Sequence, residues 1–168
     1  MSQLKVNSII PIGGVPTGGG GGIIQIVQTI KTDEVSNTDD DQFNDISGMS
    51  LAITPTSTSS KILVSAVLTV NVSTNSNIVF RLLRGSTVIG NSTSSTASPI
   101  ALGIVGGKYN GNRGNPVPIQ FLDSPSTTSA TTYKIQQYHN AGNFRLNFSN
   151  TSGSFTGSST LTLMEVSA

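Results

Sequence analysis

The stretch KILVSAVLTV, residues 61–70, decides the fold class of this 168-residue chain. Every second residue of the stretch, beginning at Ile62, is apolar, and the run contains neither glycine nor proline. This alternation predicts a strand, and ten residues in a strand span roughly 33 Å. The opposite parity mixes apolar and small polar side chains, namely Leu63, Ser65, Val67 and Thr69. We therefore expect one face in the core and the other against a second surface, such as a partner subunit. An ordinary strand of a one-sided sandwich is the alternative.

Short runs of the same kind recur along the chain, and no segment has the periodicity of an amphipathic helix. The other expected strands cover residues 23–30, 43–53 with a bulge at Gly48, 77–83 in a hairpin with 87–90, 100–105, 117–121, 131–138, 144–148 and 159–166. Together they make about nine or ten short strands, which is typical of an all-β sandwich. A jelly roll is the expected arrangement, because it places many strands in one compact domain.

Residues 1–22 differ in composition from the rest and are expected to form a docking arm ahead of the sandwich, residues 23–168. The arm ends in five glycines that predict a flexible tether and lack the lysine of a phosphate-binding loop. Its candidate docking side chains are Leu4, Val6, Ile9 and Ile12. A frayed terminus is the alternative. We recognise no secretory signal and no apolar run of the roughly 20 residues that a membrane span needs, so we expect no membrane insertion.

The composition argues against several classes of function. Only 10% of the residues are charged and the net charge is +1, whereas a nucleic-acid-binding surface needs clustered lysine and arginine. The chain has no cysteine, which excludes disulfides, thiolate metal sites and a thiol nucleophile. Its single histidine excludes metal sites built from several histidines of one chain. We expect no nucleic-acid partner, no metal and no cofactor.

Few side chains could support catalysis, and we expect no enzyme activity. The single histidine, His139, is expected in a solvated turn, and no GxSxG nucleophile motif is present. Glycoside hydrolysis would need paired carboxylates, drawn from Asp123, Glu165 or the acidic stretch 31–45. Asp123 fits better as a turn or capping residue. The acidic stretch is expected to be a solvated loop, with calcium binding as the alternative because that cation prefers several carboxylates.

Several stretches of the sequence look familiar in combination: ITPTSTSSKIL at 53–63, RLLRGSTVIG at 81–90, FLDSPSTTSATTYKIQ at 121–136, STLTLMEV at 159–166 and the opening LKVNSI at 4–9. The combination resembles the C1q/TNF-like jelly-roll domains of tail-fibre and other virion proteins of tailed phages, especially marine and cyanobacterial phages. The resemblance implies a homotrimer around a threefold axis and a binding or structural role. The chain departs from typical fibres because it has no coiled-coil or β-helical shaft.

These observations predict a virion structural protein, a short trimeric fibre or knob on the exterior of a phage particle. The arm would dock on other virion proteins, and adsorption to a host surface glycan or protein is a further hypothesis. The candidate receptor contacts are Lys108, Tyr109 and Arg113, in the glycine-rich loop 106–116. One alternative is a capsid decoration or head-fibre protein that stabilises the shell. The other is a free carbohydrate-binding module.

Overall fold

The chain is built from strands, without a helix, throughout the part that the computed structural model describes. The described residues are 22–39, 41–72, 77–91, 103–105, 114–148 and 156–167. Their strands are β1 (Ile23–Lys31), β2 (Val35–Asn37), β3 (Asn44–Ile53), β4 (Lys61–Val72), β5 (Ile78–Arg84), β6 (Thr87–Ile89), β7 (Gly103–Val105), β8 (Asn115–Asp123), β9 (Thr131–His139), β10 (Phe144–Leu146) and β11 (Ser159–Val166). The expected all-β class is confirmed. These residues accordingly include no helix long and apolar enough to cross a membrane.

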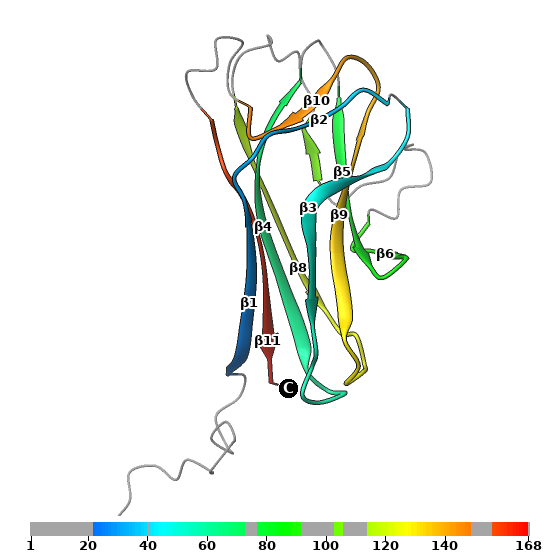
Figure 1. The fold of residues 1–168 in the computed structure, drawn as a ribbon. Helices are drawn as coiled ribbons and strands as arrows, with labels where there is room; N and C mark the ends of the chain where they lie inside the picture. The colour runs from blue at the N-terminus through cyan, green and yellow to red at the C-terminus, as the bar shows by residue number, and fades with distance from the viewer. Residues whose placement is uncertain are drawn as a thin grey trace, which may run out of the picture.

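The strands form two sheets that lie face to face (Figure 1). Sheet A has the order β1-β11-β4-β10-β2, with β8 paired to the other side of β4. Sheet B has the order β3-β9-β5-β6, with β7 also paired to β5. Every pairing between these strands is antiparallel. The arrangement is therefore a β-sandwich, and its core lies between the sheets.

β4 is the central strand of sheet A, as its apolar alternation predicts. Its inward side chains are at most 1% exposed, namely Ile62, Val64, Ala66, Leu68 and Val70. Sheet B contributes the fully buried Phe80, Leu82, Tyr133 and Ile135 to the same core. Full burial of one large aliphatic side chain stabilises a fold by about 1.5–3 kcal/mol, so this strand accounts for a large part of the core.

The predicted bulge in β3 is present at Gly48. The register between β3 and β9 shifts between Asp45 and Ser50, and Gly48 has a φ of +81°. This positive φ favours glycine, and a Cβ atom here would lie 2.5 Å from Cδ of Lys31 and would displace that side chain. The upper part of β3 is curved, as Figure 1 shows.

The structure corrects two predictions at the upper end of sheet A. The acidic stretch 31–45 is not one continuous loop, because β2 lies within it and pairs with β10. The predicted strand 144–148 stops at Leu146, because Asn147 adopts a positive φ of 62°. This left-handed residue breaks the period-two alternation, so Phe148 does not share the buried face of Phe144 and Leu146.

Candidate interaction surface

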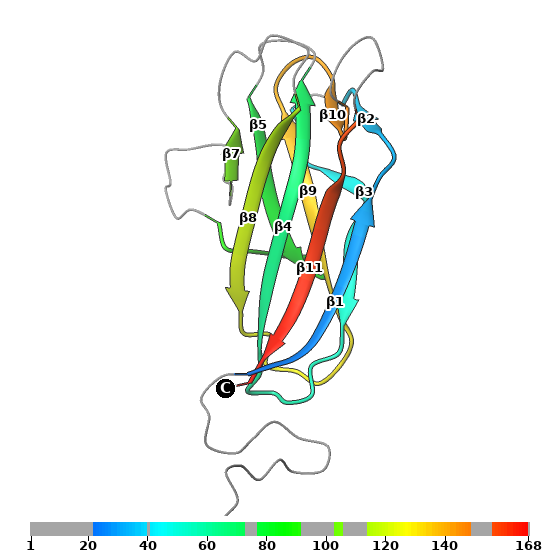
Figure 2. The same ribbon diagram turned by 90° about the vertical axis from the view of Figure 1, so that its left-hand side faces the viewer.

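The outer face of sheet A carries the largest group of exposed apolar side chains among the described residues. Figure 2 looks onto this sheet, with β8, β4, β11 and β1 side by side. The registers of the three pairings place outward side chains in rows that cross all four strands. One row is Ile26, Met164, Leu63 and Leu122, the next is Gln28, Thr162, Ser65 and Gln120, and the third is Ile30, Thr160, Val67 and Pro118. We call these twelve positions the outer face.

The outer face is apolar in its outer rows and uncharged throughout. Ile26 and Ile30 are each 57% exposed, and Leu122 and Val67 are 49% and 43% exposed. None of the twelve residues carries a charge. Gln28 donates to the hydroxyl of Thr162 across β1 and β11 at 2.8 Å, so the polar middle row is partly satisfied within the sheet. Exposed apolar rows of this kind are typical of interaction sites.

The second parity of residues 61–70, which the sequence assigned to a second surface, lies in the middle of this outer face. Leu63 and Ser65 are partly exposed and Val67 more so. What the sequence analysis missed is the contribution of the neighbouring strands. Ile26 and Ile30 lie on the same side of the sheet as Val67 because of the strand order and register, which the local pattern does not give.

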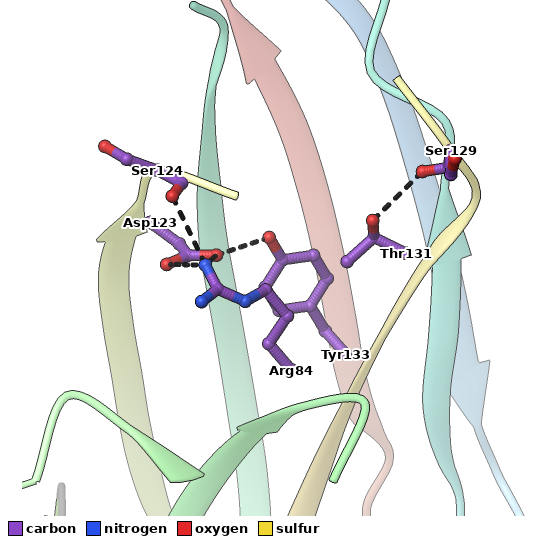
Figure 3. Close-up of polar contacts among 6 residues, drawn as sticks. All are labelled: Arg84, Asp123, Ser124, Ser129, Thr131 and Tyr133. Atoms are coloured by element: carbon purple, nitrogen blue, oxygen red, sulfur yellow. Dashed lines mark hydrogen bonds and ion pairs between the residues drawn. The ribbon is translucent and has the colours of Figure 1, made fainter. Parts of the chain in front are cut away.

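Asp123, expected in a turn, is instead the buried last residue of β8 (Figure 3). Nη1 of Arg84 lies 2.9 Å from both carboxylate oxygens, and the hydroxyl of Tyr133 donates to Oδ2 at 2.6 Å. Burial, together with the neighbouring Asp123 carboxylate, raises the pKa of Tyr133, so its phenol stays neutral. The cluster connects β8 with β5 and β9. Its polar groups form hydrogen bonds with one another, which fits a structural role.

Glu165, the second catalytic candidate, is fully buried near the end of β11. Its carboxylate accepts hydrogen bonds from Nε2 of Gln25 at 2.5 Å and from the backbone and hydroxyl of Thr56 at 2.7 Å each. Burial by itself raises the pKa of Glu165, but hydrogen bonds from Gln25, Thr56 and Ser60 outweigh it and lower the pKa to about 2. A carboxylate held this firmly in its ionised form is poorly suited to act as a general acid.

His139 is not in a solvated turn, which corrects the expectation from the sequence. It is the last residue of β9 and is fully buried. Its Nδ1 lies 3.0 Å from Oε1 of Gln137 and its Nε2 lies 3.1 Å from the carbonyl oxygen of Gly142. Every second side chain of β9 from Tyr133 to His139 is buried. The sequence pattern did not predict this for Gln137 and His139 because both residues are polar.

The acidic stretch forms ion pairs and hydrogen bonds with its own surroundings. Asp33 lies 2.6 Å from Nζ of Lys31, and Asp45 lies 2.9 Å from Nζ of Lys134. Hydrogen bonding to these lysines is the main cause of the lowered pKa of each carboxyl group. The described part of the chain contains no group of three or more histidine, cysteine, aspartate or glutamate side chains placed to hold a metal ion.

Two sets of predicted site residues lie outside the described residues. They are the docking positions Leu4, Val6, Ile9 and Ile12, and the receptor contacts Lys108, Tyr109 and Arg113. Both sets remain predictions from the sequence.

Comparison with known proteins gives little further information. The chain matches no protein-family model and no curated protein. Eleven chains of solved structures match it. One belongs to the structure of infectious bursal disease virus, Gx strain, and is 12% identical with a TM-score of 0.44, over 94% of this chain and 44% of that chain. This chain therefore spans less than half of that chain.

Proposed function

We propose that the protein is a homotrimeric jelly-roll structural protein on the exterior of a phage particle, a short fibre or knob docked by its N-terminal arm. The outer face of sheet A carries this proposal. Further copies of the chain are its best occupants, because an uncharged face can pack against neighbouring copies without repulsion between like charges. Closed cyclic symmetry then buries the patch on every copy and leaves no open end for further growth.

The strand order supports the jelly-roll assignment. The four long strands of sheet A follow the order β1-β11-β4-β8, and sheet B follows the order β3-β9-β5-β6, in which β6 is short. Most neighbours within a sheet are distant in the sequence, since the chain crosses between the sheets after most strands. Two four-stranded sheets connected in this way are the jelly-roll solution for an antiparallel protein, and virion proteins use it widely.

The positions of the chain ends support docking at one end and display at the other. Gly22 and Ser167 exchange hydrogen bonds of 2.9 and 3.0 Å at the lower end of sheet A, so the arm begins there. β8 begins with Asn115 at the upper end (Figure 2), where the chain returns from the loop that holds the candidate receptor contacts. Adsorption to a host through Lys108, Tyr109 and Arg113 remains part of the proposal.

Removal of residues 1–22 tests the docking role. The truncated chain should fold and associate as the full chain does, because the described core residues all follow Gly22 in the sequence. It should, however, be missing from purified particles of the virus, as measured by mass spectrometry of the particle proteins, whereas a tagged full-length chain is retained. Normal incorporation of the truncated chain would contradict the proposal.

A capsid decoration protein is the second candidate, and it makes the same use of the outer face. The two candidates differ in position, which a cryo-EM map of the particle decides. Density at the tail or at a fibre supports the fibre, and density distributed over the capsid shell supports decoration.

A further inference from the structure

A hollow of about 550 Å³ lies at the upper end of sheet A, outside the twelve positions of the outer face. Its lining combines a cation, a carboxylate, two small polar groups and two apolar surfaces, namely Arg145, Glu34, Ser36, Asn143, Val35 and Phe148. This volume is within the range of small-molecule sites and is sufficient for one or two sugar rings.

Strand pairing and one left-handed residue build the hollow. Arg145 pairs with Ser36 across β10 and β2, and it points outward because its neighbours Phe144 and Leu146 are fully buried. Phe148, three residues further along, would lie on the opposite face of a regular strand. The positive φ at Asn147 turns the chain, so that the guanidinium carbon of Arg145 lies 4.4 Å from the centre of the Phe148 ring.

Asn147 is held firmly in this conformation, so the hollow is preformed. Its amide donates to the carbonyl oxygens of Lys31 and Asp33 at 2.9 Å each and accepts from the hydroxyl of Ser159 at 2.7 Å. Its backbone N–H donates to the carbonyl oxygen of Thr69 at 2.8 Å. Rigid support from three strands is what a binding site needs to hold its side chains in place.

The charged groups of the hollow, Arg145 and Glu34, have no ion-pair partner among the described residues. Arg145 differs in its polar contacts from the other arginines that the structure describes. Arg81 also stacks on a ring, that of Phe43 at 3.8 Å, but it donates to Gln136 at 2.6 Å. Arg84 pairs with Asp123. Arg145 has only its ring contact within the described chain, so its planar set of N–H donors is available to a ligand.

We propose that this hollow binds a sugar that carries a carboxylate, such as a uronic acid unit of a surface polysaccharide. The guanidinium of Arg145 pairs with the sugar carboxylate in the two-bond geometry that arginine prefers. Glu34 and Ser36 take the ring hydroxyl groups, and Phe148 contacts the apolar face of the sugar. The inference extends the proposed function, because it gives the virion protein a contact with an acidic host surface, and three copies would strengthen a weak site.

The test is a titration of the full chain with sodium glucuronate, monitored by NMR spectroscopy of the protein. We expect saturable binding by the wild type and at least tenfold weaker binding by Arg145→Ala. Arg145→Lys should lose part of the affinity, because lysine keeps the positive charge but not the planar pair of N–H donors. The matched control is Arg81→Ala, which removes the other ring-stacked arginine and should bind as the wild type does. Thermal denaturation of each variant shows that it is folded.

Three results would overturn the inference: unchanged binding by folded Arg145→Ala, equal binding of neutral glucose, or tighter binding of a short peptide through its terminal carboxylate. Failure of the proposed function has a different signature. If glucuronate binds through Arg145 but the chain is missing from virus particles, the hollow is correctly assigned and the virion role is wrong. If the chain is present in particles but glucuronate does not bind, the virion role stands and the hollow is wrongly assigned.

Discussion

Glu165 connects the end of β11 with the turn at residues 54–60, and its charge makes folding depend on pH. Its folded pKa of about 2 lies below the ordinary value of 4.5. The folded state therefore binds this proton more weakly than the unfolded state does. Its contribution is complete above pH 4.5 and is lost as the pH falls towards 2. The shift corresponds to at most about 3 kcal/mol of unfolding free energy.

Urea denaturation at several pH values between 7 and 2 measures this effect. We expect the wild type to lose stability below pH 4.5, and Glu165→Gln to be less stable at pH 7 but to lose less on acidification. Glu34→Gln is the matched control, since Glu34 is exposed and accepts no comparable hydrogen bonds from described residues. The account of Glu165 is wrong if Glu165→Gln and the wild type lose the same free energy between pH 5 and pH 2.

β4 presents two different surfaces from adjacent residues, and a matched pair of substitutions separates them. Leu68 is fully buried in the core, whereas Val67 is 43% exposed on the outer face. Leu68→Asp would bury an unpaired carboxylate at a cost of several kcal/mol, which is comparable to the total stability of a domain, about 5–15 kcal/mol. We expect Leu68→Asp to be unfolded or insoluble, and Val67→Asp to fold but to associate less. Circular dichroism and thermal denaturation measure the first difference, and a wild-type melting temperature in Leu68→Asp would show that the strand is misplaced.

The elements that the sequence predicts well are those whose patterns are local. The alternation of β4 and the Gly85 turn between β5 and β6 follow from neighbouring residues, and the structure has both. β2 was missed because three residues in an acidic stretch pair only through their contact with β10. Phe148 was placed on the wrong face because the left-handed Asn147 depends on backbone groups more than 110 residues away.

The candidate surface could be predicted only in part for the same reason. The mixed second parity of residues 61–70 indicated that the outer side of this strand contacts a second surface, such as a partner subunit. The four-strand rows, however, depend on register and strand order, which bring Ile26 and Leu122 into line with Leu63 from distant parts of the chain. The hollow beside Arg145 has no sequence signal, because its parts come from two short strands and a break in alternation.

At the scale of the whole molecule, the twelve-residue outer face of sheet A and the outer side of sheet B differ in charge. Sheet B carries ion pairs and ring-stacked cations on its outer side, such as Lys134 with Asp45 and Arg81 over Phe43. The twelve outer-face positions of sheet A carry no charge. This difference favours an assembly that covers the outer face and leaves sheet B and the hollow beside Arg145 in water, as the proposed trimer with the outer face turned towards the threefold axis would do.

Native mass spectrometry of the purified full chain at micromolar concentration tests this assembly most directly. We predict a particle of three copies, and a shift towards single copies for Val67→Asp, while Lys134→Ala on sheet B leaves the three-copy particle unchanged. Salt should weaken the particle little, because no charged pair is needed on the outer face. A stable monomer of the wild-type chain under these conditions would contradict the account.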